Sequence, residues 1–237
     1  MLTSIFNKNY SFFNNYFKIY DINGRKLILS ILIILITFIK TIVNPVPASY
    51  IIQIKNQFKL QGFDIFFEYI IPLLTLIVII YVFFYDYKDE TYKMIEFYNK
   101  GNFNYIMIFR FIIPIGIITL GSFISGLFYY REISFLDIKN ILLSIRFIPN
   151  IIFISSLFLF ITSITKNIYA GILTSSTYII IDYFSSGHMF KILSIGANMN
   201  NFYYCYSPLY YFINRVLIIL LGILFLLISF KKTKINI

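Results

Sequence analysis

The residue types that build catalytic sites are scarce in this chain. Its one histidine, His188, has no acidic neighbours at metal-ligand spacing, so a metal-assisted hydrolytic site is not encoded. Its one cysteine, Cys205, excludes an internal disulfide and a multi-cysteine metal site. The serine-containing stretches 154–156 and 174–177 lack a general base and are typical of helix packing surfaces. The chain is therefore predicted not to be an enzyme by itself and to hold no metal or cofactor.

Four ionisable residues lie inside otherwise apolar stretches, where a charge is costly unless it faces protein or water. Two interpretations stay open. The four residues could line a polar vestibule on the outer side of a membrane, or an acidic residue could pair with an arginine and join two helices. In the second case the arginine side chains could also extend toward the membrane surface. We favour pairing. The residues are Glu68, Arg146, Asp182 and Arg215.

The composition determines which elements must position these residues. Of the 237 residues, 59% are apolar, 21% aromatic and 13% charged, which is too apolar for a soluble surface. A bilayer core of about 30 Å is crossed by about 20 apolar residues, and these form a helix because backbone polar groups in lipid must be satisfied within the chain. We therefore predict an all-α polytopic membrane protein. Its transmembrane domain, 27–230, would contain six spans, at about 27–43, 64–85, 103–130, 138–165, 168–184 and 209–230.

The net charge of +10 indicates topology rather than nucleic-acid binding, because the 20 Lys and Arg residues are spread over every loop. If the N-terminus is inside, twelve of them fall in cytoplasmic segments and eight do not, a modest positive-inside bias. This predicts a multi-pass protein of the cell membrane with both termini cytoplasmic, and a basic cytoplasmic tail at 231–237.

The N-terminal segment 1–26 places polar and aromatic residues on opposite faces at helical spacing. Such a helix is predicted to lie on the membrane surface, where Lys8 and Lys18 would meet anionic lipid headgroups. Packing of this helix against another part of the protein remains the alternative.

The most polar stretch in the middle of the chain, 86–100, is also amphipathic. Oppositely charged residues stand four apart at Asp89 and Lys93 and again at Glu96 and Lys100, which favours a short helix in water. Each pair contributes only a few tenths of a kcal/mol, so the pairs do not explain why the segment exists. By topology it lies on the cytoplasmic surface between the second and third spans, where a partner could bind it.

The sequence from this stretch into the third span, "DETYKMIEFYNKGNFNYIMIFR", resembles the corresponding segment in the membrane subunits of ABC-2 type ABC transporters. In that family an acidic residue and a threonine open a coupling helix that docks into a cleft of the ATP-binding subunit, and a basic residue follows at the start of the third span. Here Glu90 replaces the family's usual glycine before the threonine, and "NKGN" replaces its common proline. The resemblance implies that 86–100 is a coupling helix, with coupling residues Asp89, Glu90, Thr91, Met94, Glu96 and Arg110.

The resemblance also implies an architecture and partners. The chain would have the ABC-2, type V exporter-like fold, with short re-entrant helices at 185–208 on the outer face. No nucleotide-binding motif is present, so ATP and Mg²⁺ would be bound by a separate ATP-binding subunit. A second permease, identical or related, would complete a dimer in the lipid bilayer.

The predicted function is therefore that of a permease subunit. It would export an amphipathic or hydrophobic substrate, such as a peptide, a bacteriocin-like compound or a lipid. Two alternatives remain: a secondary transporter or channel, and a membrane accessory or immunity protein that does not transport. The first is disfavoured because no internal repeat and no acidic residue at mid-membrane are evident.

Overall fold

The computed structural model describes residues 25–47, 65–88, 92–93, 103–133, 135–196 and 208–232. Within these ranges the chain is helical and contains no strand, as predicted from the composition. The elements follow in the order α2 (Arg25–Val43), η2 (Phe66–Ile70, a π-helical turn), α4 (Ile71–Lys88), α6 (Phe103–Tyr129), α7 (Ile138–Ile145), α8 (Ile148–Thr165), α9 (Ile168–Phe184), η3 (Lys191–Leu193, a 3₁₀ turn) and α10 (Pro208–Lys232).

Five helical stretches in the described ranges are long and apolar enough to cross a membrane. They are Arg25–Val43, Phe66–Lys88, Met107–Tyr129, Asn140–Thr165 and Leu209–Phe230. The sixth predicted span coincides with α9, which has 17 residues and a length of about 25 Å at 1.5 Å per residue. It is the shortest of the helices that run the length of the bundle.

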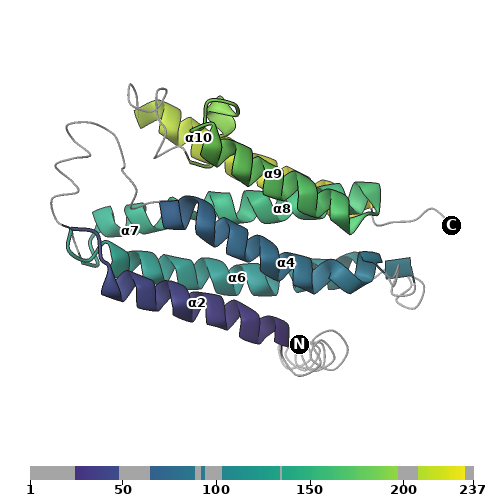
Figure 1. The fold of residues 1–237 in the computed structure, drawn as a ribbon, viewed down its shortest axis with the longest axis horizontal. Helices are drawn as coiled ribbons and strands as arrows, with labels where there is room; N and C mark the ends of the chain where they lie inside the picture. Colours follow the sequence, from purple (N-terminus) through teal and green to yellow (C-terminus); the bar gives the residue numbers. More distant parts are fainter. Residues whose placement is uncertain are drawn as a thin grey trace, which may run out of the picture.

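The long helices run alternately in opposite directions (Figure 1). The start of α2, the end of α4 and the end of α10 lie at one end of the bundle, which we call the terminal end (Figure 1). The opposite end, here the distal end, holds the end of α2, the end of α6 and the start of α10. There the backbone N–H of Val46 donates to the carbonyl of Tyr129 at 2.9 Å, and Arg131 Nη2 donates to the carbonyl of Ile42 at 3.1 Å.

Proline explains an irregularity in the predicted span 138–165, which consists of two helices. Pro149 has no N–H and its ring would collide with the carbonyl of Ile145, so α7 ends at that residue and α8 begins at Ile148. The side chain of Asp137 accepts a hydrogen bond from the N–H of Ile138 and caps α7.

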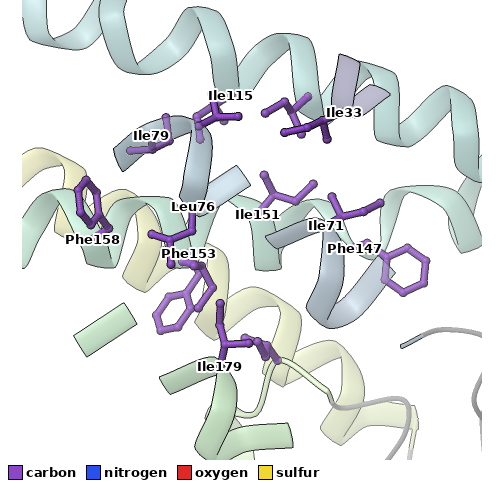
Figure 2. Packing of buried hydrophobic residues seen from close by; sticks show 14 of the residues in the cluster. Ile33, Ile71, Leu76, Ile79, Ile115, Phe147, Ile151, Phe153, Phe158 and Ile179 are labelled. Carbon is purple, nitrogen blue, oxygen red and sulfur yellow. The ribbon is translucent and has the colours of Figure 1, made fainter. Parts of the chain in front are cut away.

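Helix α8 is the centre of the bundle and packs against α4, α6, α9 and α10. Its side chains Ile151 and Phe158 are fully buried and meet Leu76 and Ile79 of α4 in one apolar core (Figure 2). The outward faces of α2 and α10 carry exposed Ile and Leu side chains, as expected where helices contact lipid.

The α2–α6 contact requires a small residue at Gly121, and this yields a matched pair of substitutions within one helix. A methyl group added at Gly121 would come within 2.5 Å of the Ile34 side chain, whereas one added at Gly116 would meet no heavy atom within 4 Å. We expect Gly121→Ala to destabilise the fold by about 1–3 kcal/mol, because inserted atoms in a packed contact force side chains and backbone apart.

Gly116→Ala is the control. It should leave stability unchanged or raise it by up to about 1 kcal/mol, because alanine favours the helix. Thermal unfolding of the two variants in detergent measures the difference, and equal midpoints would show that the α2–α6 contact is looser than described.

Candidate functional site

An ion pair joins the helices on either side of the predicted coupling segment. Arg110, in the second turn of α6, lies with Nη1 2.5 Å from Asp86 Oδ2 near the end of α4. Its Nη2 donates to the carbonyl of Val82 at 2.7 Å, and its guanidinium lies over the Phe83 ring, 5.2 Å from the centroid. The Asp86 and Arg110 side chains are only 9% and 2% exposed. Two charges so deeply buried must neutralise each other, so the pair fixes the end of α4 against the start of α6.

Tyr92, in the predicted coupling segment, lies at the same place. Tyr92 is buried and stacks on Tyr87 of α4, with ring centroids 5.3 Å apart. The Lys166 ammonium, in the turn between α8 and α9, lies 5.0 Å from the centroid of the Tyr92 ring. Lys93, the next residue, is exposed. The segment thus starts on a surface made by α4 and the α8–α9 turn.

Of the predicted coupling residues, Arg110 is the one in the described ranges, and it is bound inside the bundle by Asp86. Sequence reasoning named Asp86 as the start of the segment but missed it as the partner of Arg110. The available signal was two opposite charges, each a few residues inside an apolar helix. The other predicted coupling residues lie outside the described residues: Asp89, Glu90, Thr91, Met94 and Glu96.

A second group of polar side chains is buried near the distal end. Arg215 of α10 lies with Nη2 3.7 Å from Glu68 Oε1, and its Nη1 donates to Asn150 Oδ1 at 2.5 Å. Asn150 Nδ2 in turn donates to the carbonyl of Ile195 at 2.9 Å. Glu68 and Asn150 are fully buried. The contacts connect η2, α8 and α10 with the segment after η3.

Pro72 explains why Glu68 lies in a π-helical turn. Because Pro72 has no N–H, the carbonyl of Glu68, four residues earlier, loses its ordinary helical donor. Asn150 Nδ2 reaches this carbonyl at 3.4 Å, a long hydrogen bond, while the N–H of Ile71 donates to the carbonyl of Phe66. The side chain of Asn150 in α8 thus replaces a missing backbone donor inside the bundle.

Asp182, at the end of α9, binds the same segment from the other side. Its Oδ2 accepts from the backbone N–H groups of Ile195 and Gly196 at 3.0 and 3.1 Å. It also accepts from the hydroxyls of Ser194 and Tyr69 at 3.0 and 3.1 Å. The carboxylate is fully buried. Four donors on Oδ2 compensate for burying its charge, and within the described residues no arginine pairs with it.

Asn214 and Arg215 complete the enclosure of this segment. Asn214 Nδ2 donates to the carbonyls of Ile192 and Ser194 at 2.6 and 2.9 Å, and Arg215 Nη2 donates to that of Ile195 at 3.3 Å. We call these side chains, with the backbone of 192–196, the distal polar cluster. Its members are Glu68, Tyr69, Asn150, Asp182, Asn214 and Arg215.

The four charges singled out in the sequence therefore separate into two groups. Asp182 and Arg215 bond the segment 192–196, and Glu68 joins this group through its pair with Arg215. Arg146 lies elsewhere, in the turn between α7 and α8, where its Nη2 donates to the Tyr130 hydroxyl at 2.9 Å. Its guanidinium also lies 4.8 Å from the centroid of the Phe147 ring. Asn150 and Asn214 were missed, although each is an amide inside an apolar stretch, beside Pro149 and Arg215 respectively.

The described ranges contain no group of three His, Cys, Asp or Glu side chains that could hold a metal ion. A comparison with protein-family models finds no match, and comparisons with curated proteins and with solved structures find none either. The functional argument accordingly depends on the geometry of the two polar groups and of the segment between α4 and α6.

Removing one partner of the Asp86–Arg110 pair should lower the free energy of unfolding far more than removing both charges. Arg110→Met leaves a buried carboxylate without its cation and is expected to destabilise by about 3–5 kcal/mol. Adding Asp86→Leu should recover most of this loss, because two apolar side chains tolerate the site. Thermal unfolding in detergent gives both values. Glu132→Gln is the control, because it breaks the exposed Arg131–Glu132 pair and should cost under about 1 kcal/mol. A double variant as unstable as Arg110→Met alone would contradict the pairing.

Removing the Asp182 carboxylate should loosen the segment 192–196 locally. Asp182→Ala leaves the buried N–H groups of Ile195 and Gly196 without acceptors, so their hydrogen exchange should accelerate by about tenfold or more. Asp182→Asn, which retains an acceptor oxygen, should accelerate it less. Asp137→Ala removes an exposed carboxylate from the same end of the bundle and serves as the control. Unchanged protection in Asp182→Ala would mean that the packing of Ile195 and the hydrogen bonds from Asn150, Asn214 and Arg215 hold the segment without the carboxylate.

Proposed function

We propose that this chain is the membrane permease subunit of an ATP-driven exporter of the ABC-2 type. It moves an amphipathic or hydrophobic substrate outward, with energy supplied by a separate ATP-binding subunit that binds the segment 86–100. The observation that carries the proposal is the buried ion pair between Asp86, near the end of α4, and Arg110, near the start of α6.

A coupling element must transmit force to the helices that carry it. Because Arg110 bonds both Asp86 and the carbonyl of Val82, the end of α4 cannot separate from the start of α6 without exposing a buried charge. A displacement of the segment between them is therefore passed to both helices together. The stacking of Tyr92 on Tyr87, and of Lys166 over Tyr92, extends this connection to the α8–α9 turn.

The proposed orientation places the terminal end in the cytoplasm. The Lys and Arg residues of the described ranges favour this orientation under the positive-inside rule, with eight at the terminal end and six at the distal end. The eight are Arg25, Lys26, Lys88, Lys93, Arg110, Lys166, Lys231 and Lys232.

The proposed six-span architecture counts α9 as a span. The start of α2 and the end of α10 lie at the same end of the bundle, which requires an even number of passes (Figure 1). With 17 residues, α9 is at the short limit for crossing a bilayer, and it packs against both α4 and α8. In the proposed assembly a second permease, identical or related, faces this copy.

The ATP-binding partner is tested by co-purification. The double variant Glu90→Ala, Glu96→Ala should lose most of a co-expressed ATP-binding chain, because it removes two of the three acidic side chains among the predicted coupling residues and leaves Asp89. Its own thermal midpoint should stay unchanged, since neither residue belongs to the buried pair. Glu132→Ala, which removes a carboxylate from the distal end, should retain the partner. Undiminished co-purification with the double variant would speak against the coupling role.

Accessibility labelling checks that the segment faces the cytoplasm. In a Cys205→Ser background, Lys93→Cys should react with a membrane-impermeant maleimide only after permeabilisation of the cells. Met189→Cys, exposed at the distal end, should react in intact cells. Labelling of Lys93→Cys in intact cells would overturn the permease proposal. A secondary transporter or a non-transporting accessory protein would be stable and active without any ATP-binding chain.

A further inference from the structure

A cavity opens at the distal end between the last turn of α2 and the start of the η2–α4 helix. Its volume is about 470 Å³. Val43 and Pro45 line it on one side, and Ile65, Phe66 and Ile70 line it on the other. Lys40 and Asn44 contribute the polar side chains of its α2 wall, and Tyr129 closes it from α6. The cavity thus combines one ammonium and one amide with apolar and aromatic walls.

The ammonium of Lys40 has an aromatic ring as its contact in this cavity. Its Nζ lies 3.5 Å from the centroid of the Phe66 ring. In the described part of the chain no carboxylate lies within ion-pair distance of it. The face of a ring compensates a cation by about 0.5–2 kcal/mol, less than an anion would at the same distance. The site therefore presents a positive charge, held in place by Phe66, to whatever enters the cavity.

The position of Lys40 along the bundle indicates which kind of ligand can enter. Lys40 is three residues from the end of α2, about 4.5 Å along the helix axis, so it lies at headgroup depth when the bundle spans a bilayer. Below it on α2, Ile36 and Ile39 are each 60% exposed. On α4, Leu73 and Ile77 continue the exposed apolar stripe that begins at Ile70. Two lipid-facing apolar stripes thus run from the cavity toward the middle of the bundle.

We propose that this cavity binds the phosphodiester headgroup of an anionic phospholipid of the outer leaflet. Lys40 pairs with the phosphate, Asn44 hydrogen-bonds to its ester or glycerol oxygens, and an acyl chain extends along Ile36 and Leu73. The charge complementarity at Lys40 selects an anionic headgroup over a zwitterionic one. The site involves neither the Asp86–Arg110 pair nor the segment 86–100, so binding does not depend on the proposed transport function. Only its assignment to the outer leaflet rests on the proposed orientation.

A single reporter can be introduced cleanly because the chain contains no tryptophan. Val43 lines the cavity and is 68% exposed, so Val43→Trp places an indole beside the proposed headgroup. The full chain is reconstituted in phosphatidylcholine vesicles that contain an increasing fraction of phosphatidylglycerol with brominated acyl chains, which quench a tryptophan in contact with them. Brominated phosphatidylcholine at the same fractions gives the reference.

We expect phosphatidylglycerol to occupy the site with about fivefold higher relative affinity than phosphatidylcholine, the effect of about one lysine charge near a headgroup. Lys40→Gln should abolish this preference. Lys191→Gln, which removes an exposed cation from another element at the same end, should preserve it. Absence of a preference in the parent protein, or an equal loss in both variants, would overturn the proposal, since the effect would then come from the general surface charge.

Two further quenching experiments identify which kind of anion occupies the cavity. Equal quenching by a brominated fatty acid would assign the site to carboxylates, and reversal of quenching by millimolar inorganic phosphate would assign it to free phosphate. Either result overturns the phospholipid proposal. Native mass spectrometry of the tryptophan-free chain gives an independent readout. Lys40→Gln should retain one phosphatidylglycerol fewer than the parent, and equal retention would contradict the site even if the Val43→Trp reporter perturbs the cavity.

Discussion

A charge or backbone polar group that is removed from water inside a lipid-facing bundle must find its partner within the protein. The described structure meets this requirement in two places, one near each end. At the terminal end Arg110 and Asp86 neutralise each other, and Arg110 also bonds the carbonyl of Val82. At the distal end Arg215 pairs with Glu68, while Asp182 Oδ2 accepts from donors in 194–196 and from Tyr69. Because an uncompensated charge at either place would cost several kcal/mol, both groups constrain which helices are adjacent.

Irregular backbone occurs where these side chains can satisfy it. Pro72 removes a helical donor beside Glu68, and Asn150 of α8 supplies one at that carbonyl. The segment 192–196 leaves carbonyls and N–H groups without helical partners, and these bond to Asn150, Asp182 and Asn214. Non-helical backbone at membrane depth is tolerated when it is buried in protein in this way. The distal polar cluster therefore supports the backbone through hydrogen bonds as well as containing the Glu68–Arg215 ion pair.

The two ends consequently differ in how many helices their buried polar contacts connect. The distal polar cluster connects η2, α8, α9 and α10 through a buried segment, which makes that end a closed unit. The terminal end has one buried ion pair and an aromatic contact, and the segment proposed to bind an ATP-binding subunit begins there. Under the proposed function, a force applied to the segment 86–100 moves α4 and α6 together and is passed to the distal end, which hydrogen bonds hold together. The proposed lipid headgroup site lies next to this end, beside α2.

The sequence by itself determined the helical class and the ranges of the long helices, because about 20 apolar residues admit no other backbone arrangement in lipid. It also identified Glu68, Asp182 and Arg215 as residues that needed a partner, since each is an ionisable group in an apolar stretch. It could not assign the partners. Asp86 and Arg110 are separated by 24 positions, and Asn150 and Arg215 by 65, so only the packing of α4 on α6 and of α8 on α10 brings them together. The break at Pro149 follows from proline itself and was readable in the sequence. The four donors to Asp182 were decided by tertiary structure, because hydrogen bonds between distant segments leave no periodic signal in the chain.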